Sequence, residues 1–283
     1  MCRSGNDTQV VPYIINREVS HMDKTLYNAY VSILKEELLP AMGCTEPIAV
    51  AYAAAVAARE LGCTPETVEI VVSGNIIKNV KSVVVPNTGG LRGLAAAAAA
   101  GIVAGDPDAA LQVISRATEA DHRRIAEYLK TADFPIRESD SGYIFDIDIR
   151  LHAAGHSARC RIAGYHTNII RIERDGEIRT DVPYAEAGQN YATDRSLLNI
   201  EQIVEFADCV DIEDVRETLE RQMAYNLAIA KEGLTGNYGA RIGQVLLRSY
   251  GNDVHVRAKA WAAAASDARM NGCSLPVVIN SGS

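Results

Sequence analysis

Cys44 has the sequence setting of a metal ligand or a reactive thiol. It lies in the stretch 42–47, just before a predicted alanine-rich helix that runs from about residue 46 to residue 61. Thr45 is the predicted N-cap of this helix, and Pro47 lies in its first turn, where a missing N–H costs little. The free amides and the positive end of the helix dipole favour thiolate over thiol. Because a thiolate is the form that binds a metal, Cys44 is a candidate ligand.

Cys273 has a similar setting at the other end of the chain. A predicted long helix ends at Gly272, and Cys273 follows it in a tight, polar turn. The two cysteines are 229 residues apart, so no local spacing rule links them. Cysteine is among the most buried residue types, and composition alone favours an inert core or loop residue at both positions.

A glycine-rich loop, Pro-Asn-Thr-Gly-Gly-Leu-Arg-Gly at 86–93, leads into an alanine run at 95–100. Exposed amides at the start of a helix bind anions well. The glycine spacings of a phosphate loop and of a dinucleotide-binding loop are both absent. The alternative is a turn whose glycines allow close helix packing.

Three separate motifs occur in one order along the chain and together resemble the L-cysteine desulfidase family. Members of that family in turn resemble the α-chain of iron–sulfur L-serine dehydratases. The motifs are Gly-Cys-Thr-Glu-Pro at 43–47, the loop at 85–93, and Asn-Gly-Cys-Ser-Leu-Pro at 271–276 with Asn-Ser-Gly-Ser at 280–283. The resemblance extends from about residue 22 to the end of the chain.

This resemblance implies a [4Fe–4S] cluster that is held by three cysteines and leaves one iron open to substrate. Cys44 and Cys273 match the first two ligands, and the third lies beyond Ser283 in relatives. The 283-residue chain is therefore expected to hold a cluster poorly and to show negligible activity. The loop then becomes the expected site for the substrate carboxylate, with the residues Asn87, Thr88, Gly89, Gly90 and Arg92.

The function that the resemblance implies is β-elimination from L-cysteine, which gives pyruvate, ammonia and hydrogen sulfide. The cluster would act as the Lewis acid that binds the leaving group. Two alternatives stay open: L-serine dehydration, which differs only in the leaving group, and a cluster-free ligand-binding or regulatory relative. No catalytic residue is identified, since Lys78, Lys81 and Glu46 are candidates for the base by position only.

Composition restricts the partners. The net charge of −8 argues against nucleic acid and anionic membranes, and no apolar run reaches the 18 residues of a transmembrane helix. Residues 1–21 lack the apolar core of a signal peptide and are predicted to be a leader or disordered arm. The scattered cysteines fit reduced thiols in the cytoplasm. The expected partner is a small amino-acid substrate, and a homo-oligomer is left open.

The hydrophobic pattern predicts an α+β fold. Residues 22–105 and 184–283 show mainly helical periodicity and form the predicted cluster-binding part. Between them, apolar residues alternate from Tyr143 onward, and Asp175-Gly176 is a hairpin turn. We expect 106–183 to form an inserted, separable α+β unit with a small antiparallel sheet.

The histidines of this inserted unit show no metal-binding spacing. Residues His152, His156 and His166 are predicted to lie on exposed faces. His122, which stands among charged neighbours, is predicted to belong to a solvated helix face.

Overall fold

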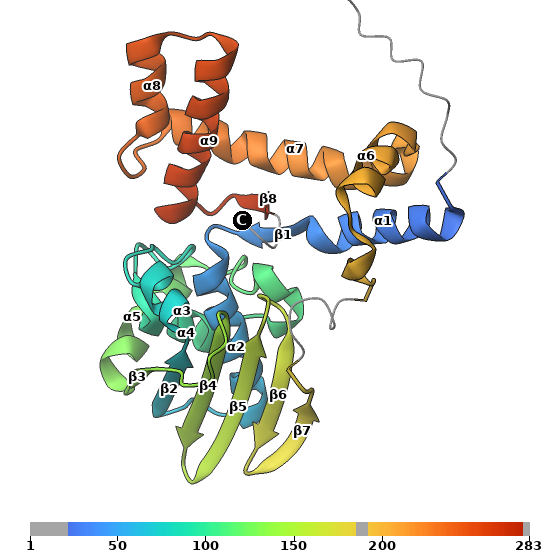
Figure 1. The fold of residues 1–283 in the computed structure, drawn as a ribbon. Coiled ribbons are helices and arrows are strands. Elements are labelled where there is room, and N and C mark those ends of the chain that lie inside the picture. The colour runs from blue at the N-terminus through green and yellow to red at the C-terminus, as the bar shows by residue number, and fades with distance from the viewer. Residues whose placement is uncertain (1–21, 185–191, 280–283) are drawn as a thin grey trace, which may run out of the picture.

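A computed structural model describes residues 22–184 and 192–279. The predicted leader at 1–21 and the Asn-Ser-Gly-Ser motif at 280–283 lie outside the described residues. Two layers are visible in Figure 1: a twisted sheet with its covering helices, and a second layer built from helices α6–α9. The mixed α+β class is as predicted.

The helices occupy about half of the chain and alternate with short connections. They are α1 Lys24–Glu37, α2 Thr45–Leu61, α3 Gly74–Val80, α4 Gly93–Ala104, α5 Glu119–Thr131, α6 Ile200–Cys209, α7 Ile212–Thr235, α8 Ile242–Tyr250 and α9 Val254–Met270, with 3-10 turns η1 Pro107–Gln112 and η2 Arg195–Leu197. The strands are β1 Leu39–Met42, β2 Thr67–Val72, β3 Ile136–Glu138, β4 Asp146–Ala153, β5 His156–Ala163, β6 Ile169–Arg174, β7 Glu177–Asp181 and β8 Pro276–Ile279.

Six strands form the main sheet in the order β3-β2-β4-β5-β6-β7. The four strands predicted from Tyr143 onward pair antiparallel as expected, whereas β3, which joins the sheet through β2, runs parallel to β2. Helices α4 and α5 lie in the connection between these two strands and supply the crossover that a parallel pair requires. Strand β2 precedes residue 106, so the sheet extends beyond the predicted inserted unit. The separability of 106–183 stays a prediction.

Helix α2 is the centre of the larger core. It packs against β4 and β5 on one side and α4 on the other, and seven of its 17 residues are alanines, five of which have no exposed surface. Gly101 of α4 explains the small residues, because a Cβ built there would lie 2.0 Å from the carbonyl oxygen of Ala51. The two helix backbones therefore touch at this point.

The helical layer has smaller, separate cores. Tyr30 of α1 packs with Phe206 of α6 and Val215 of α7. Helix α9 approaches α7 closely at Gly233, where an added Cβ would meet the backbone of Ala264 at 2.0 Å. Within the described ranges, no helix is both long and apolar enough to cross a membrane.

A short two-stranded sheet joins the beginning and the end of the described chain. Strands β1 and β8 pair antiparallel, from Leu39 opposite Ile279 to Met42 opposite Pro276. Figure 1 shows this pair between the two layers. Strand β1 ends two residues before Cys44, and β8 begins three residues after Cys273, so the pairing brings both cysteine-bearing turns to one region.

Candidate functional site

The three sequence motifs meet at the N-terminus of α2. A Cβ on Gly43 would lie 2.6 Å from Cγ of Pro86 in the glycine-rich loop, and Nε of Arg269 donates to the Gly43 carbonyl oxygen at 3.4 Å. In the third motif, a Cβ on Gly272 would lie 2.4 Å from Val84, which precedes the glycine-rich loop. Both glycines have positive φ, at 56° and 84°. The glycine before each cysteine is thus required by backbone conformation and by close packing.

Cys44 is itself the N-cap of α2, one residue before the predicted cap. Its side chain is 5% exposed, and Sγ donates to Oε2 of Glu46 at 3.0 Å. Burial, and then the adjacent Glu46 carboxylate, raise the pKa of Cys44 to about 12. Burial and the neighbouring negative charge thus shift the pKa of Cys44 in the direction opposite to that expected from the helix end.

The carboxylate of Glu46 is the common hydrogen-bond acceptor for the polar groups around Cys44. Besides the thiol, its carboxylate accepts from Nδ2 of Asn79 at 3.2 Å and from Oγ1 of Thr45 at 3.3 Å. Burial by itself raises the pKa of Glu46, but the hydrogen bond from Cys44 foremost, then the backbone amide of Glu46, the charge of His166 and the hydrogen bond from Asn79, leave it below its usual value. The site thus contains an ionised, half-buried carboxylate at the start of α2. The sequence indicated Glu46 by position only.

Cys273 lies in a small apolar cluster with Ile229 and Val277 and is 4% exposed. Tyr238 lies beside it, and the hydroxyl of Tyr238 donates to Oε1 of Glu232 at 2.9 Å. Burial, followed by the hydrogen bonds with Glu232 and Cys273, raises the pKa of Tyr238. The second cysteine therefore has a phenol as its polar neighbour.

Two side chains of the glycine-rich loop shape the loop itself. Nδ2 of Asn87 donates to the carbonyl oxygens of Ile114 at 3.1 Å and Ser115 at 3.2 Å. The buried hydroxyl of Thr88 donates to the Val85 carbonyl at 2.6 Å. The side-chain donors of Asn87 and Thr88 are thus used to fix the loop conformation, which leaves them few hydrogen bonds to offer a ligand.

Gly89 and Gly90 are exposed, as is Arg92. Within the described residues, neither glycine amide has an acceptor, and the two N–H groups can therefore bind an anion. Nη1 of Arg92 donates to the Ser82 carbonyl oxygen at 2.6 Å. His122 does not lie on a solvated face as predicted: its ring packs under Gly89, and its Nε2 is buried without a partner in the described structure.

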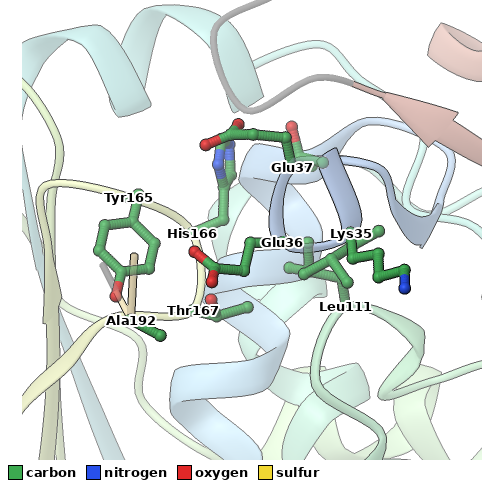
Figure 2. A pocket seen from close by; sticks show the side chains of 10 residues that line it. Lys35, Glu36, Glu37, Leu111, Tyr165, His166, Thr167 and Ala192 are labelled. Carbon is green, nitrogen blue, oxygen red and sulfur yellow. The ribbon is translucent and has the colours of Figure 1, made fainter. Parts of the chain in front are cut away.

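A cavity of about 390 Å³ opens beside Thr45. Figure 2 shows its walls, which are the end of α1, the β5–β6 loop with His166, and Leu111 of η1. The predicted exposed position of His166 is wrong, because its ring packs on Phe145 at 4.6 Å between centroids. Its Nε2 is buried, again without a hydrogen-bond partner among described residues. His152 and His156 are exposed as predicted.

Nothing in the local sequence signals this cavity. Its walls come from residues that are more than 100 positions apart, such as Glu36 and His166. His166 stands in a loop with no metal or catalytic spacing around it. Only the fold brings it to the start of α2.

A [4Fe–4S] cluster with one iron open to substrate requires three thiolate ligands. Cys44 and Cys273 are two donors. Across 22–184 and 192–279, no three residues of the types His, Cys, Asp and Glu gather as a metal site. The described residues therefore do not make a complete cluster site.

Residues 108–283 match the family model described as serine dehydratase alpha chain. The chain belongs to this family. It is also similar to UPF0597 proteins, with 56% identity over 257 residues to one from Desulfitobacterium hafniense and 45% over 258 residues to one from Lachnoclostridium phytofermentans. These matches cover 91% of this chain and 60% and 62% of the relatives.

The relationship confirms the resemblance to the serine dehydratase alpha chain. A further relative, from Treponema denticola, is 41% identical over 268 residues, which are 93% of this chain and 62% of the relative. The chain thus spans about three fifths of the length of these relatives. No solved structure matches it.

Proposed function

We propose that this chain belongs to a lyase that removes a β-substituent from a small L-amino acid. The substrate we favour is L-cysteine, with pyruvate, ammonia and hydrogen sulfide as products. The observation that supports this proposal is the meeting of the Gly43–Cys44 turn, the glycine-rich loop and the Gly272–Cys273 turn in a member of the serine dehydratase alpha chain family.

The family is linked to iron–sulfur chemistry in general. A bound cluster would supply a Lewis acid for the leaving group. Since the described residues contribute two of the three required thiols, no reaction step is derived through the cluster. The roles below concern only the residues of this chain.

The substrate carboxylate is assigned to the exposed amides of Gly89 and Gly90. Two adjacent N–H groups without an internal acceptor, next to the N-terminus of α4, suit a carboxylate. The side chains of Asn87 and Thr88 support this role indirectly, because they fix the loop conformation through Ile114, Ser115 and Val85.

Glu46 is assigned a positioning role. It receives hydrogen bonds from Cys44 and Asn79, and so fixes the start of α2. Its carboxylate is half-buried at the start of α2 and offers a negative charge for an α-ammonium group.

L-Serine is the second candidate substrate, and the description of the matching family favours it. The two reactions share the carboxylate and ammonium contacts and differ in the leaving group. The residues described above bind the shared part of both substrates, so product analysis must distinguish them.

The test uses a chimera in which residues 22–283 replace the matching segment of the Desulfitobacterium protein, because that relative supplies the length that this chain does not span. The chimera is purified anaerobically and incubated with L-cysteine or L-serine. We expect pyruvate and ammonia in equal amounts, with equal sulfide from L-cysteine. If neither amino acid yields pyruvate, the lyase proposal is wrong and a ligand-binding relative is favoured.

A further inference from the structure

We propose that a groove between α7, α9 and β8 binds a small apolar carboxylate, and that the guanidinium of Arg269 holds the carboxylate group. This site goes beyond the proposed function, since none of the residues assigned to the amino-acid substrate lines the groove. The proposal rests on three features: an uncovered apolar wall, a single charged side chain with free donors, and the fixed position of that side chain. Figure 1 shows where the three elements meet.

The first feature is the apolar wall. The groove has a volume of about 560 Å³, which lies within the usual range for small-molecule sites, roughly 300–1,000 Å³. Met223 and Leu227 of α7 line it and are 54% and 48% exposed, whereas Val277 of β8, also in the lining, is buried. Trp261 of α9 lines the groove as well. Large apolar side chains that stay exposed in a concave site gain free energy when a ligand covers them.

The second feature is the charge. Among the eleven described residues that line the groove, Arg269 is the only charged one. Its Nε donates to the Gly43 carbonyl oxygen, but Nη1 and Nη2 have no hydrogen-bond or ion-pair partner among the described residues. A guanidinium presents these N–H groups as a planar fork that matches the two oxygens of a carboxylate. The groove therefore suits an anion with an apolar tail.

The third feature is the fixed position of the walls. The contact between Nε and the Gly43 carbonyl oxygen, at 3.4 Å, restricts the Arg269 guanidinium. Asn226 attaches β8 to α7, since its Nδ2 donates to the Val278 carbonyl oxygen at 2.8 Å and its Oδ1 accepts from the Val278 amide at 2.9 Å. A ligand that enters the groove orders few further groups, which lowers the entropic cost of binding.

The probe is hexanoate, and the reporter is Trp261, which is the only tryptophan of the chain. The 283-residue chain is titrated with hexanoate while the fluorescence of Trp261 is recorded, and we expect a saturable change at millimolar concentration. Hexanol has a tail of the same length without the charge and should bind about tenfold more weakly, since it lacks a charge-assisted hydrogen bond. No saturable change with hexanoate overturns the inference, and so does equal binding of hexanol.

Two further ligands test the head and the tail separately. Hexylamine keeps the tail and carries a positive charge that Arg269 repels, whereas acetate keeps the carboxylate and lacks the tail. Neither should give a saturable change in the fluorescence of Trp261 at the concentrations that saturate with hexanoate. Binding of hexylamine as tight as that of hexanoate overturns the role of charge, and binding of acetate as tight as that of hexanoate overturns the role of the apolar wall.

A pair of variants tests the position of the site. Met223→Glu places a negative charge on the exposed wall and should weaken hexanoate binding about tenfold, because it repels the carboxylate and removes apolar contact. Val245→Glu is the matched control, since Val245 is 50% exposed on α8 and lies outside the groove. Its hexanoate binding should be unchanged. Equal binding by the two variants overturns the inference.

The role of Arg269 is tested by its ligand preference. Arg269→Met keeps a stem of similar length and loses the charge, so the preference for hexanoate over hexanol should disappear. A general loss of structure would weaken both ligands and leave their ratio unchanged. A preference that persists in Arg269→Met overturns the role of the guanidinium. If this variant does not fold, Met223→Glu and the ligand series on the wild-type chain decide.

The longer relatives provide the last test, because this chain spans about three fifths of their length. The chimera with the Desulfitobacterium protein is titrated with hexanoate by calorimetry and should bind it as the 283-residue chain does. If the chimera does not bind hexanoate, the additional length of the relative fills the groove, and the inference is overturned. Every readout here is binding, so the outcome does not depend on whether the chimera forms pyruvate.

Discussion

The side chain of Arg269 donates from Nε to the carbonyl oxygen of Gly43 at 3.4 Å, across 226 residues of sequence. This contact fixes the last turn of α9 against the turn that precedes Cys44. Together with the antiparallel pairing of β1 and β8, this contact brings the two ends of the described chain together at the candidate site. The site is thus assembled from both ends of the described chain.

Gly43→Ala should destabilise the protein by about 3 kcal/mol. Alanine disfavours the positive φ of this residue, and its Cβ would lie 2.6 Å from Pro86. The control is Gly62→Ala, at φ 76° with no atom within 4 Å of the new Cβ. The control should cost only about 1 kcal/mol. Urea denaturation of both variants measures the difference. Equal losses would show that Pro86 does not pack against Gly43.

Gly101→Ala should destabilise the protein, although the same change in an ordinary helix stabilises by about 1 kcal/mol. The new Cβ would lie 2.0 Å from the carbonyl oxygen of Ala51, so α4 must move away from α2. We expect a loss of about 2 kcal/mol or more in urea denaturation. A gain in stability would contradict the close packing of these helices.

Asp146 should make the protein sensitive to acid. Burial by itself raises the pKa of Asp146, but hydrogen bonds from Arg161, Ser139 and Ser141 leave it below its usual value. A lowered folded-state pKa contributes stability above the unfolded-state value, about 3.9, and this stability is lost as pH falls through the folded-state pKa. The urea concentration at the midpoint of denaturation should therefore fall as the pH is lowered from 7 to 3.

In Asp146→Asn this part of the acid dependence should disappear, and stability at pH 7 should fall by about 2 kcal/mol, since hydrogen bonds to a charged group are lost. The control is Glu127→Gln, which breaks an exposed pair with Lys130 and should change little. An unchanged pH profile in Asp146→Asn would show that this carboxylate has no such role.

Gly90→Val in the chimera should raise KM for the amino-acid substrate several-fold, because a side chain would stand where the amides must approach the carboxylate. The control is Gly142→Val. Both glycines have positive φ and open space around the Cβ position, so both changes strain the backbone similarly. Equal kinetics in the two variants would make the loop a packing turn only.

The parts of the fold that could be predicted depend on local patterns. The start of α2 was placed within one residue by Thr45 and Pro47, because caps and proline act over one turn. The hairpin at Asp175-Gly176 followed from its turn chemistry, and both residues have positive φ in the structure.

The parts that could not be predicted depend on contacts between distant segments. Asp146 and Asp148 alternate with apolar residues in β4, and this pattern alone does not show whether their side chains are solvated. Both are buried, because Arg159 and Arg161 of the neighbouring strand β5 pair with them and cover them. The burial of His166 and the raised pKa of Cys44 have the same cause, because burial is a property of the packed fold and not of the local sequence.

The proposed function requires that Cys44 and Cys273 serve one iron-binding site. Iron content after anaerobic reconstitution of the chimera with iron and sulfide tests it most directly. We predict bound iron with an absorption band near 400 nm, lost in Cys44→Ser and in Cys273→Ser, and kept in Cys63→Ser, whose cysteine is exposed in a distant turn. Iron that stays bound when either Cys44 or Cys273 is replaced, or a wild-type chimera that binds none, would contradict the claim.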